Sequence, residues 1–221
     1  MSEQRQIDTV IFDLGGVLMR NGRHSDFTKN FPPEVAAEAQ RIFVGEFGVD
    51  TDHPWHRLER GEISMEDCRK EQMAAFAAAG IEMPARPTPP PTEDGKPSPM
   101  LTFQPNEEMM DLAARLRAAG IGTGILTNNA REFRDLWRNL MPYEELFDDI
   151  VDSHEVGLRK PNPAIYELAL SRLGGTPERA AFLDDLPSNV EAANALGMFG
   201  VVVDVDAAPA IAEVERLARL G

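Results

Sequence analysis

The stretch that decides the fold is "IDTVIFDLGGVLM", residues 7–19. Residues 10–12 form an apolar run of β-branched and aromatic side chains, typical of a strand buried on both faces of a sheet. The run ends in Asp13, and a carboxylate at the end of a buried strand is costly unless another group pairs with it. Gly15 and Gly16 follow, and glycines allow a sharp turn and a close approach to the main chain. These residues alone fit either a binding site or a solvated aspartate before a turn.

The composition of the 221-residue chain narrows the classes of protein to which it can belong. Its formal net charge of −15 argues against nucleic acid and anionic membrane surfaces as partners, because both bind clustered Lys and Arg. The polar start lacks the apolar core of a signal peptide, and no apolar run approaches the length of a membrane span. Cys68 is the only cysteine, so we expect no intrachain disulfide and no cysteine zinc site. A globular protein of the cytoplasm is expected.

The second half of the chain alternates between strand and helix patterns. Strands are predicted in "IGTGILT" (121–127), "DDIVDS" (148–153), "AAFLDD" (180–185) and "FGVVVDV" (199–205). Helices are predicted over residues 106–120, 130–140, 162–175 and 188–197, with Asn106 as an N-cap and a capping box formed by Ser188 and Glu191. Strands that alternate with helices indicate an α/β fold, in which helices cover both faces of a parallel sheet.

Residues 20–100 follow a different pattern, which is helical and contains no strand signal. Helices are predicted within residues 32–48, 53–61 and 64–80, the last with a capping box formed by Ser64 and Asp67. We therefore predict a helical insertion in a core made of residues 1–19 and 101–221. The proline-rich loop at residues 84–99 favours extended, poorly ordered backbone, as a surface spacer or as a docking site for a partner.

Polar side chains follow the predicted strands at the point where each strand ends. They are Asp13, Thr127 and Asn128, Lys160 on the loop after the third of these strands, and Asp184 and Asp185. Ligands of open parallel sheets bind outside the carboxyl ends of the strands, so we expect these groups to converge. Each has an ordinary structural interpretation when taken alone, as a helix cap, a solvated loop residue or a surface charge. Their order along the chain favours a common site.

Three carboxylates, a hydroxyl, an amide and an amine are a set that suits phosphoryl transfer. Carboxylates and a main-chain carbonyl are the hard oxygen ligands that Mg²⁺ prefers. A carboxylate can also act as a nucleophile and form an aspartyl-phosphate. The hydroxyl, the amide, the ammonium and the N–H groups at a helix start would then donate to the phosphoryl oxygens.

Four motifs carry a resemblance to a known family. "FDLGGVL", "ILTNN", "LRKPNP" and "FLDD" occur in the order of the motifs of the haloacid dehalogenase-like (HAD) hydrolase superfamily, which the chain resembles over essentially its whole length. The chain is most similar to the branch that contains the N-terminal phosphatase domain of soluble epoxide hydrolase, and "LERGEIS" in the insertion is similar to that branch too. The resemblance implies a Rossmann-like core, a cap formed by the insertion, Mg²⁺ as the cofactor and a small phosphorylated metabolite as the substrate.

The resemblance also implies a role for each residue that matches a motif. It makes Asp13 the nucleophile and a metal ligand, Gly15 a metal ligand through its carbonyl, Thr127 and Asn128 phosphate ligands, Lys160 the partner of nucleophile and phosphate, Asp185 the direct metal ligand, and Asp184 a ligand through water or the group that orients Lys160.

Gly15 departs from the pattern of the phosphatases in this superfamily. They usually carry a second aspartate at this position, which protonates the leaving group and later activates water. Relatives similar to bacterial sugar-phosphate phosphatases also have glycine there, so its presence does not exclude activity. His24 and Asp26 are candidates for the missing acid. The other histidines, His53, His56 and His154, lack metal-ligand spacing and are interpreted as structural or solvated.

Three classes of function remain open. The leading one is a Mg²⁺-dependent phosphatase, the second is a metal-independent 2-haloacid dehalogenase, and the third is a binding or regulatory module with weak activity. Asp184 and Asp185 argue against the dehalogenase, because two carboxylates beside Asp13 would repel the charge of the nucleophile unless a cation were present. Metal-dependent hydrolysis of an aryl phosphate separates the first class from the other two.

Overall fold

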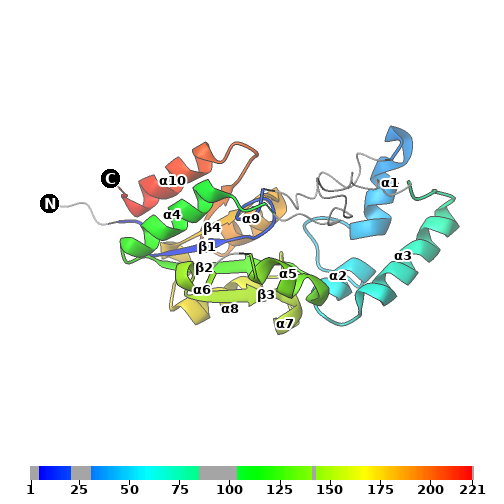
Figure 1. Cartoon of the computed structure of the whole chain (residues 1–221), viewed down its shortest axis with the longest axis horizontal. Coiled ribbons are helices and arrows are strands. Elements are labelled where there is room, and N and C mark those ends of the chain that lie inside the picture. The colour runs from blue at the N-terminus through cyan, green and yellow to red at the C-terminus, as the bar shows by residue number, and fades with distance from the viewer. Residues whose placement is uncertain (1–4, 21–30, 85–103, 141–142, 221) are drawn as a thin grey trace, which may run out of the picture.

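A five-stranded parallel sheet forms the centre of the structure, a computed structural model that describes residues 5–20, 31–84, 104–140 and 143–220 (Figure 1). The strands are β1 (Thr9–Phe12), β2 (Gly122–Thr127), β3 (Asp149–Asp152), β4 (Ala180–Asp184) and β5 (Phe199–Val202). Their order across the sheet is β3-β2-β1-β4-β5, so that β1 lies in the middle and Thr9 pairs with both Gly122 and Ala180. The predicted strands and the α/β fold are confirmed.

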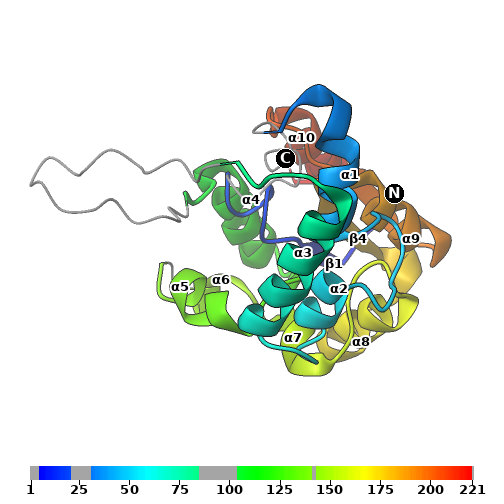
Figure 2. The ribbon, with the colours of Figure 1, turned by 90° about the vertical axis from the view of Figure 1, so that its right-hand side faces the viewer.

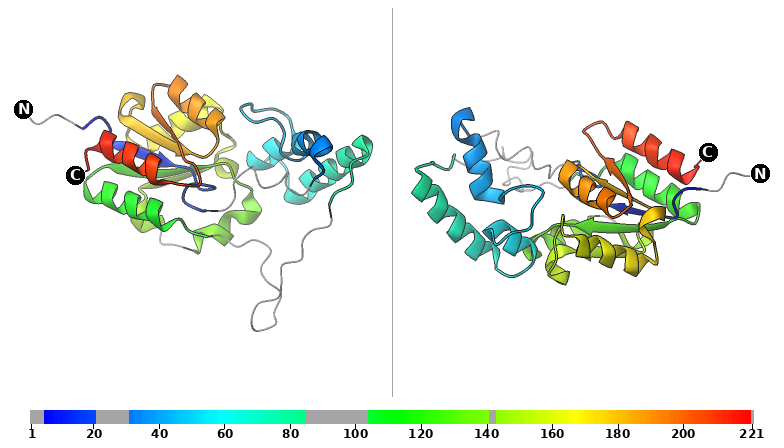
Figure 3. Two further views of the ribbon diagram at one scale, coloured as in Figure 1. Left: turned by 90° about the horizontal axis from the view of Figure 1, so that it is seen from above. Right: turned by 180° about the vertical axis from the view of Figure 1, so that it is seen from behind.

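Helices cover both faces of this sheet (Figure 3). One face packs against α4 (Glu107–Ala118) and α10 (Ala208–Ala218), and the other against α8 (Pro163–Leu173) and α9 (Pro187–Ala195). Val10 and Phe12 belong to the apolar cluster with α4 and α10, whereas Ile11 belongs to the cluster with α8 and α9. The apolar run of β1 is therefore buried on both faces, because successive side chains of a strand point to opposite sides.

Of the described helices that lie between β1 and β2 in the sequence, the three before α4 lie beyond the carboxyl ends of the strands (Figures 1 and 2). They are α1 (Pro33–Val44), α2 (Pro54–Glu59) and α3 (Met65–Ala79). α1 and α3 share a small apolar cluster formed by Phe31, Ala39 and Phe76. We call α1–α3 and their connections the insertion. Residues 85–99 of the proline-rich loop lie outside the described residues, so the prediction for that loop stays a prediction.

Shorter elements complete the described chain. They are the 3₁₀ turns η3 (Arg131–Phe133) and η4 (Pro177–Arg179), and the helices α5 (Arg134–Arg138), α6 (Tyr143–Leu146) and α7 (Ser153–Val156). The helix predicted over residues 130–140 is present as η3 followed directly by α5, so its first turn is a 3₁₀ turn. Phe133 packs towards the insertion and Trp137 towards the sheet. No helix in the described ranges is long and apolar enough to cross a lipid bilayer.

The two predicted capping boxes differ in outcome. The Ser64 hydroxyl accepts a hydrogen bond from the Asp67 main-chain N–H at 3.1 Å and caps α3, which confirms the first box. The second is wrong, because α9 begins at Pro187 with Leu186 as its N-cap, and the buried Ser188 hydroxyl has no hydrogen-bond partner in the described chain. Proline has no N–H and suits the first position of a helix, so the N-cap lies two residues earlier than predicted.

Asn106 connects the start of α4 to the loop after β1. It occupies the N-cap position as predicted, but its side chain makes no capping hydrogen bond. Its amide donates instead to the Val17 carbonyl at 3.0 Å, and its main-chain N–H donates to the Leu18 carbonyl at 2.8 Å. Asn106 thus holds in place the loop that follows Asp13.

Candidate active site

The carboxyl edge of the sheet brings together polar residues from several strand ends. Phe12 pairs with Leu183 of β4 and with Ile125 of β2, so Asp13, directly after β1, lies beside Asp184 at the end of β4. The main-chain N–H of Asp13 donates to the Leu183 carbonyl at 2.8 Å and extends the pairing by one residue. The predicted convergence therefore includes the aspartates of the first and the fourth motif.

Lys160 connects the ends of three strands. Its Nζ lies 2.8 Å from Oδ1 of Asp13 and 2.7 Å from Oδ2 of Asp184, and it donates to the Leu126 carbonyl at 3.0 Å. The side chain is only 1% exposed and passes over the Phe182 ring, 5.4 Å from its centroid. The ammonium is thus the cation that the partly desolvated Asp13 requires.

The Asp184 carboxylate is surrounded by donors. Its Oδ2 accepts from Lys160 and from Nδ2 of Asn189 at 3.0 Å, and its Oδ1 accepts from the Leu186 N–H at 2.8 Å. The side chain is fully buried. Of the two roles implied for Asp184, this geometry favours the one that orients Lys160. Sequence reasoning missed Asn189, whose signal was its place in the first turn of the helix after the aspartate pair.

Gly16 allows the loop after β1 to approach Asp185 closely. Its φ of 73° lies in the left-handed region, and a Cβ built on it would lie 2.6 Å from Cγ of Asp185. Asp13, Asp184 and Asp185 each offer an oxygen within 4.8 Å of the others. Gly15 is half-buried and bridges to Met19. The second glycine of the pair is therefore the one that the carboxylate cluster requires.

Burial and surplus negative charge govern the protonation of Asp13. Desolvation is the largest influence and raises its pKa, Lys160 lowers the pKa, and Asp184 and Asp185 raise it further, so that the pKa reaches about 8. Burial opposes the charge on Lys160, but the attraction of Asp13 and Asp184 outweighs it and raises the pKa of the ammonium. Asp13 and Asp184 share the Lys160 ammonium, and Asp185 adds a third carboxylate whose oxygen lies within 4.8 Å of theirs. Hard oxygen donors at this spacing fit Mg²⁺.

Thr127 and Asn128 follow β2 at the same edge of the sheet. Thr127 is the last residue of β2 and is buried. The Asn128 side chain binds the main chain of Lys160 twice: its Nδ2 donates to the Lys160 carbonyl at 3.0 Å, and its Oδ1 accepts from the Lys160 N–H at 2.8 Å. Asn128 therefore fixes the loop that carries Lys160, which the sequence did not suggest. The phosphate-binding roles of both residues stay predictions.

The histidines divide between described and undescribed parts of the chain. His24 and Asp26, the candidates for the missing acid, lie outside the described residues. His53 accepts from the Trp55 N–H at 3.1 Å and caps α2, and His154 lies 2.7 Å from Oδ1 of the buried Asp152. These contacts agree with the structural interpretation of both side chains.

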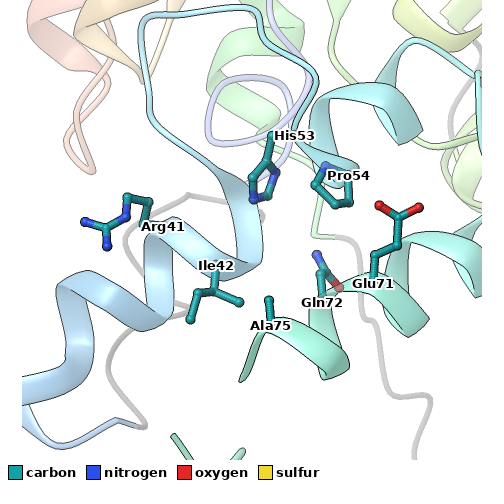
Figure 4. Close-up of a pocket in the computed structure, with 7 residues that line it drawn as sticks. All are labelled: Arg41, Ile42, His53, Pro54, Glu71, Gln72 and Ala75. Carbon is teal, nitrogen blue, oxygen red and sulfur yellow. The ribbon is translucent and has the colours of Figure 1, made fainter. Parts of the chain in front are cut away.

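A cavity of about 300 Å³ lies within the insertion (Figure 4). Its walls come from α1, the start of α2 and α3, through Arg41, Ile42, His53, Pro54, Glu71, Gln72 and Ala75. Neither Lys160 nor the clustered carboxylates line it. The cavity is therefore separate from the carboxylate cluster.

Comparisons with known proteins agree with the geometry. A family model described as a haloacid dehalogenase-like hydrolase matches residues 7–197. The chain is 30% identical to bifunctional epoxide hydrolase 2 of Rattus norvegicus over 93% of this chain, although it spans only 38% of that protein. It is 31% identical to sesquiterpene phosphatase astK of Aspergillus oryzae, over 86% of this chain and 87% of the relative. The structure of a predicted HAD-like hydrolase from Porphyromonas gingivalis is 25% identical with a TM-score of 0.61, over 96% of this chain and 98% of that one.

Proposed function

Because the chain belongs to the haloacid dehalogenase-like hydrolases and has phosphatases among its relatives, we propose that it is a Mg²⁺-dependent phosphatase of a small phosphorylated metabolite. One observation carries the proposal. Asp13 and Asp184 are buried, lie within 4.8 Å of the half-buried Asp185, and both contact the Lys160 ammonium. This arrangement suits a carboxylate nucleophile that works beside a divalent cation.

In the proposed reaction Asp13 attacks the phosphorus atom of the substrate. An oxygen–phosphorus bond forms to the carboxylate, the bond to the leaving oxygen breaks, and that oxygen takes a proton from water and departs as an alcohol. Water then attacks the aspartyl-phosphate, which releases inorganic phosphate and restores the carboxylate. Lys160 orients Asp13 throughout, while Thr127 and Asn128 donate to the phosphoryl oxygens.

Asp13, Asp185 and the Gly15 carbonyl are the groups that we propose as ligands of Mg²⁺. When bound, the ion supplies positive charge to the phosphoryl oxygens. The spacing of the three carboxylates and the raised pKa of Asp13 support this assignment. Asp184 already receives its hydrogen bonds from protein donors, so we propose that it positions Lys160.

We further propose that the insertion is a cap domain, formed by residues 20–100 on a core made of residues 1–19 and 101–221. Its helices lie beyond the carboxyl ends of the strands (Figure 1), where the substrate would enter. A cap in this position would contact the part of the substrate that lies outside the phosphoryl group.

Hydrolysis of p-nitrophenyl phosphate tests the proposed function. We expect turnover that requires Mg²⁺ and falls below a few per cent of wild type in Asp13→Asn. Asp8→Asn, the same change at the opposite end of β1, is the matched control and should keep most of the activity. Metal-independent release of halide from a 2-haloacid, without phosphate release, would instead identify a dehalogenase. Absence of both reactions would favour a binding module.

A further inference from the structure

Arg159 and Lys160 are neighbours on one loop but bind different parts of the molecule. Lys160 contacts the carboxylate cluster of the core. The Arg159 guanidinium contacts the insertion: its Nε donates to Oε2 of Glu59 on α2 at 2.7 Å, and its Nη1 donates to the Val49 carbonyl at 2.7 Å. The loop that carries Arg159 and Lys160 therefore contacts both the proposed active site and the insertion.

The ion pair between Arg159 and Glu59 is buried. The exposed fraction is 7% for Arg159 and 3% for Glu59. The second carboxylate oxygen of Glu59 accepts from the Trp55 indole N–H at 2.9 Å, one turn earlier on α2. A buried pair of this kind adds little net stability compared with an apolar contact, because both charges lose their hydration. Its directional hydrogen bonds do, however, fix the position of α2 relative to Lys160.

The loop at residues 45–53, which joins α1 to α2, lies against two segments of the proposed site. Val49 contacts Arg159 on one side. On the other side, a Cβ built on Gly48 would lie 3.1 Å from Cβ of Ser188, in the first turn of the helix that follows Asp185. The loop therefore spans the distance between the segments that carry Lys160 and Asp185.

We propose that Arg159 is a positioning residue that anchors α2 and the loop 45–53 beside Lys160, so that this part of the insertion contacts the leaving group of the substrate. The proposal rests on the proposed phosphatase function. It implies that the rate of hydrolysis of a phosphate ester with a large leaving group depends on the contacts of Arg159 with the insertion. An acyl phosphate with a small leaving group does not reach the insertion, so its rate of hydrolysis does not depend on these contacts.

Two variants separate this role from simple loss of stability. Arg159→Met removes the guanidinium and leaves Glu59 as an unpaired buried charge. Arg159→Met combined with Glu59→Gln removes both charges, while the Gln carbonyl still accepts from Trp55. Gly61 of the insertion lies against the main chain of His154 on α7, since a Cβ built on it would lie 2.6 Å from the His154 carbonyl oxygen, and this approach involves neither substituted side chain. Arg179→Met is the matched control, because Arg179 pairs with Asp8 at 2.5 Å at the amino edge of the sheet.

We expect kcat/KM for p-nitrophenyl phosphate to fall about tenfold or more in the double variant, since small displacements of positioning groups can cost up to about 10²-fold. The kcat/KM for acetyl phosphate should change less than about twofold, because Lys160 and the carboxylates stay in place. Amide hydrogen exchange over residues 45–60 should become faster in the double variant. Arg179→Met should leave unchanged both the amide exchange of residues 45–60 and the ratio of the kcat/KM values for the two substrates.

Equal losses for both substrates, or unchanged exchange over residues 45–60, would overturn the proposal. The exchange measurement does not depend on turnover. If wild type hydrolyses neither phosphate, the proposed function fails while exchange still tests the anchor. If wild type hydrolyses both phosphates and the ratio of their kcat/KM values is the same in the double variant, only the positioning role of Arg159 fails.

Discussion

At the scale of single residues, the ionised form of Asp13 is costly for the fold. Burial and the neighbouring Asp184 and Asp185 raise its pKa to about 8, although Lys160 opposes the shift. An aspartate in an unfolded chain has a pKa near about 3.9. Between these two values the native protein binds one proton more than the unfolded chain. The free energy of unfolding of the metal-free protein therefore falls as the pH rises through this window.

Asp13→Asn should remove this pH dependence, because an amide does not titrate. In metal-free buffer we expect the variant to melt at a higher temperature than wild type at pH 8.5, by several degrees, since 1 kcal/mol corresponds to about 2–4 °C for a chain of this size. The difference should shrink at pH 5, where Asp13 in wild type is already protonated. Calorimetry at the two pH values measures it. A difference in melting temperature that does not vary with pH would contradict the pKa assigned to Asp13.

The two glycines after Asp13 differ in backbone conformation, and a substitution at Gly15 tests whether the site lacks an acid for the leaving group. Gly15 is not among the described glycines with a positive φ, whereas Gly16 is. Gly15→Asp should restore an acid for the leaving group. We expect the rate of hydrolysis of alkyl phosphates to rise relative to that of aryl phosphates. General acids typically contribute roughly 10²–10⁴-fold, which sets the upper limit of the gain.

Gly15→Ala is the control for that substitution, because it adds a Cβ without a carboxyl group. Both variants are assayed with a series of phosphate esters whose leaving alcohols differ in pKa. A wild-type rate that hardly depends on the leaving group would show that another residue already serves as the acid, and Gly15→Asp would then gain nothing.

Residue identities at strand ends were predictable, but many of their partners were not. Asp13, Asp184 and Asp185 follow apolar runs that are readable in the sequence, and parallel strands carry such ends to one edge. The double contact of Asn128 with the Lys160 main chain depends on how two loops meet. The pair formed by Glu59 and Arg159 joins residues 100 positions apart, and no local pattern marks it.

At the scale of elements, the serines at the two predicted capping boxes give a direct test. Ser64→Ala should lower the free energy of unfolding by about 1 kcal/mol, because it removes the acceptor of the Asp67 N–H. Ser188→Ala should be close to neutral, because the Ser188 hydroxyl is buried and has no partner in the described chain. Urea unfolding of both variants measures the difference. Equal destabilisation would mean that Ser188 caps α9 in solution.

Strands were more predictable than helix limits, for a physical reason. The apolar runs of β1, β4 and β5 identify buried strands, and the shorter apolar pairs of β2 and β3 are recognised from their alternation with helices. Helix ends are set by single residues: Pro187 starts α9 before the predicted cap at Ser188, and the helix predicted over residues 130–140 begins with the 3₁₀ turn η3. α10 was not predicted, although its apolar side chains, among them Val214 and Leu217, complete one face of the sheet.

At the scale of the whole molecule, Mg²⁺ should stabilise the fold. A ligand that binds only the native state adds about 2.7 kcal/mol at a concentration 100 times its dissociation constant. We expect Mg²⁺ to raise the melting temperature of wild type and of Asp8→Asn, and to leave that of Asp185→Asn nearly unchanged. Titration calorimetry of the three proteins checks the same assignment without turnover. Equal stabilisation of all three would place the ion outside the carboxylate cluster.

The central position of β1 has a consequence for biosynthesis. β1 leaves the ribosome first, but its neighbours in the sheet begin at residues 122 and 180. At about 5–20 residues per second, this apolar strand waits on the order of ten seconds for its second neighbour. During that time the nascent chain exposes an unpaired strand and needs protection from aggregation. The clustered aspartates come together only after residue 185 has been synthesised, so the proposed active site forms late in translation.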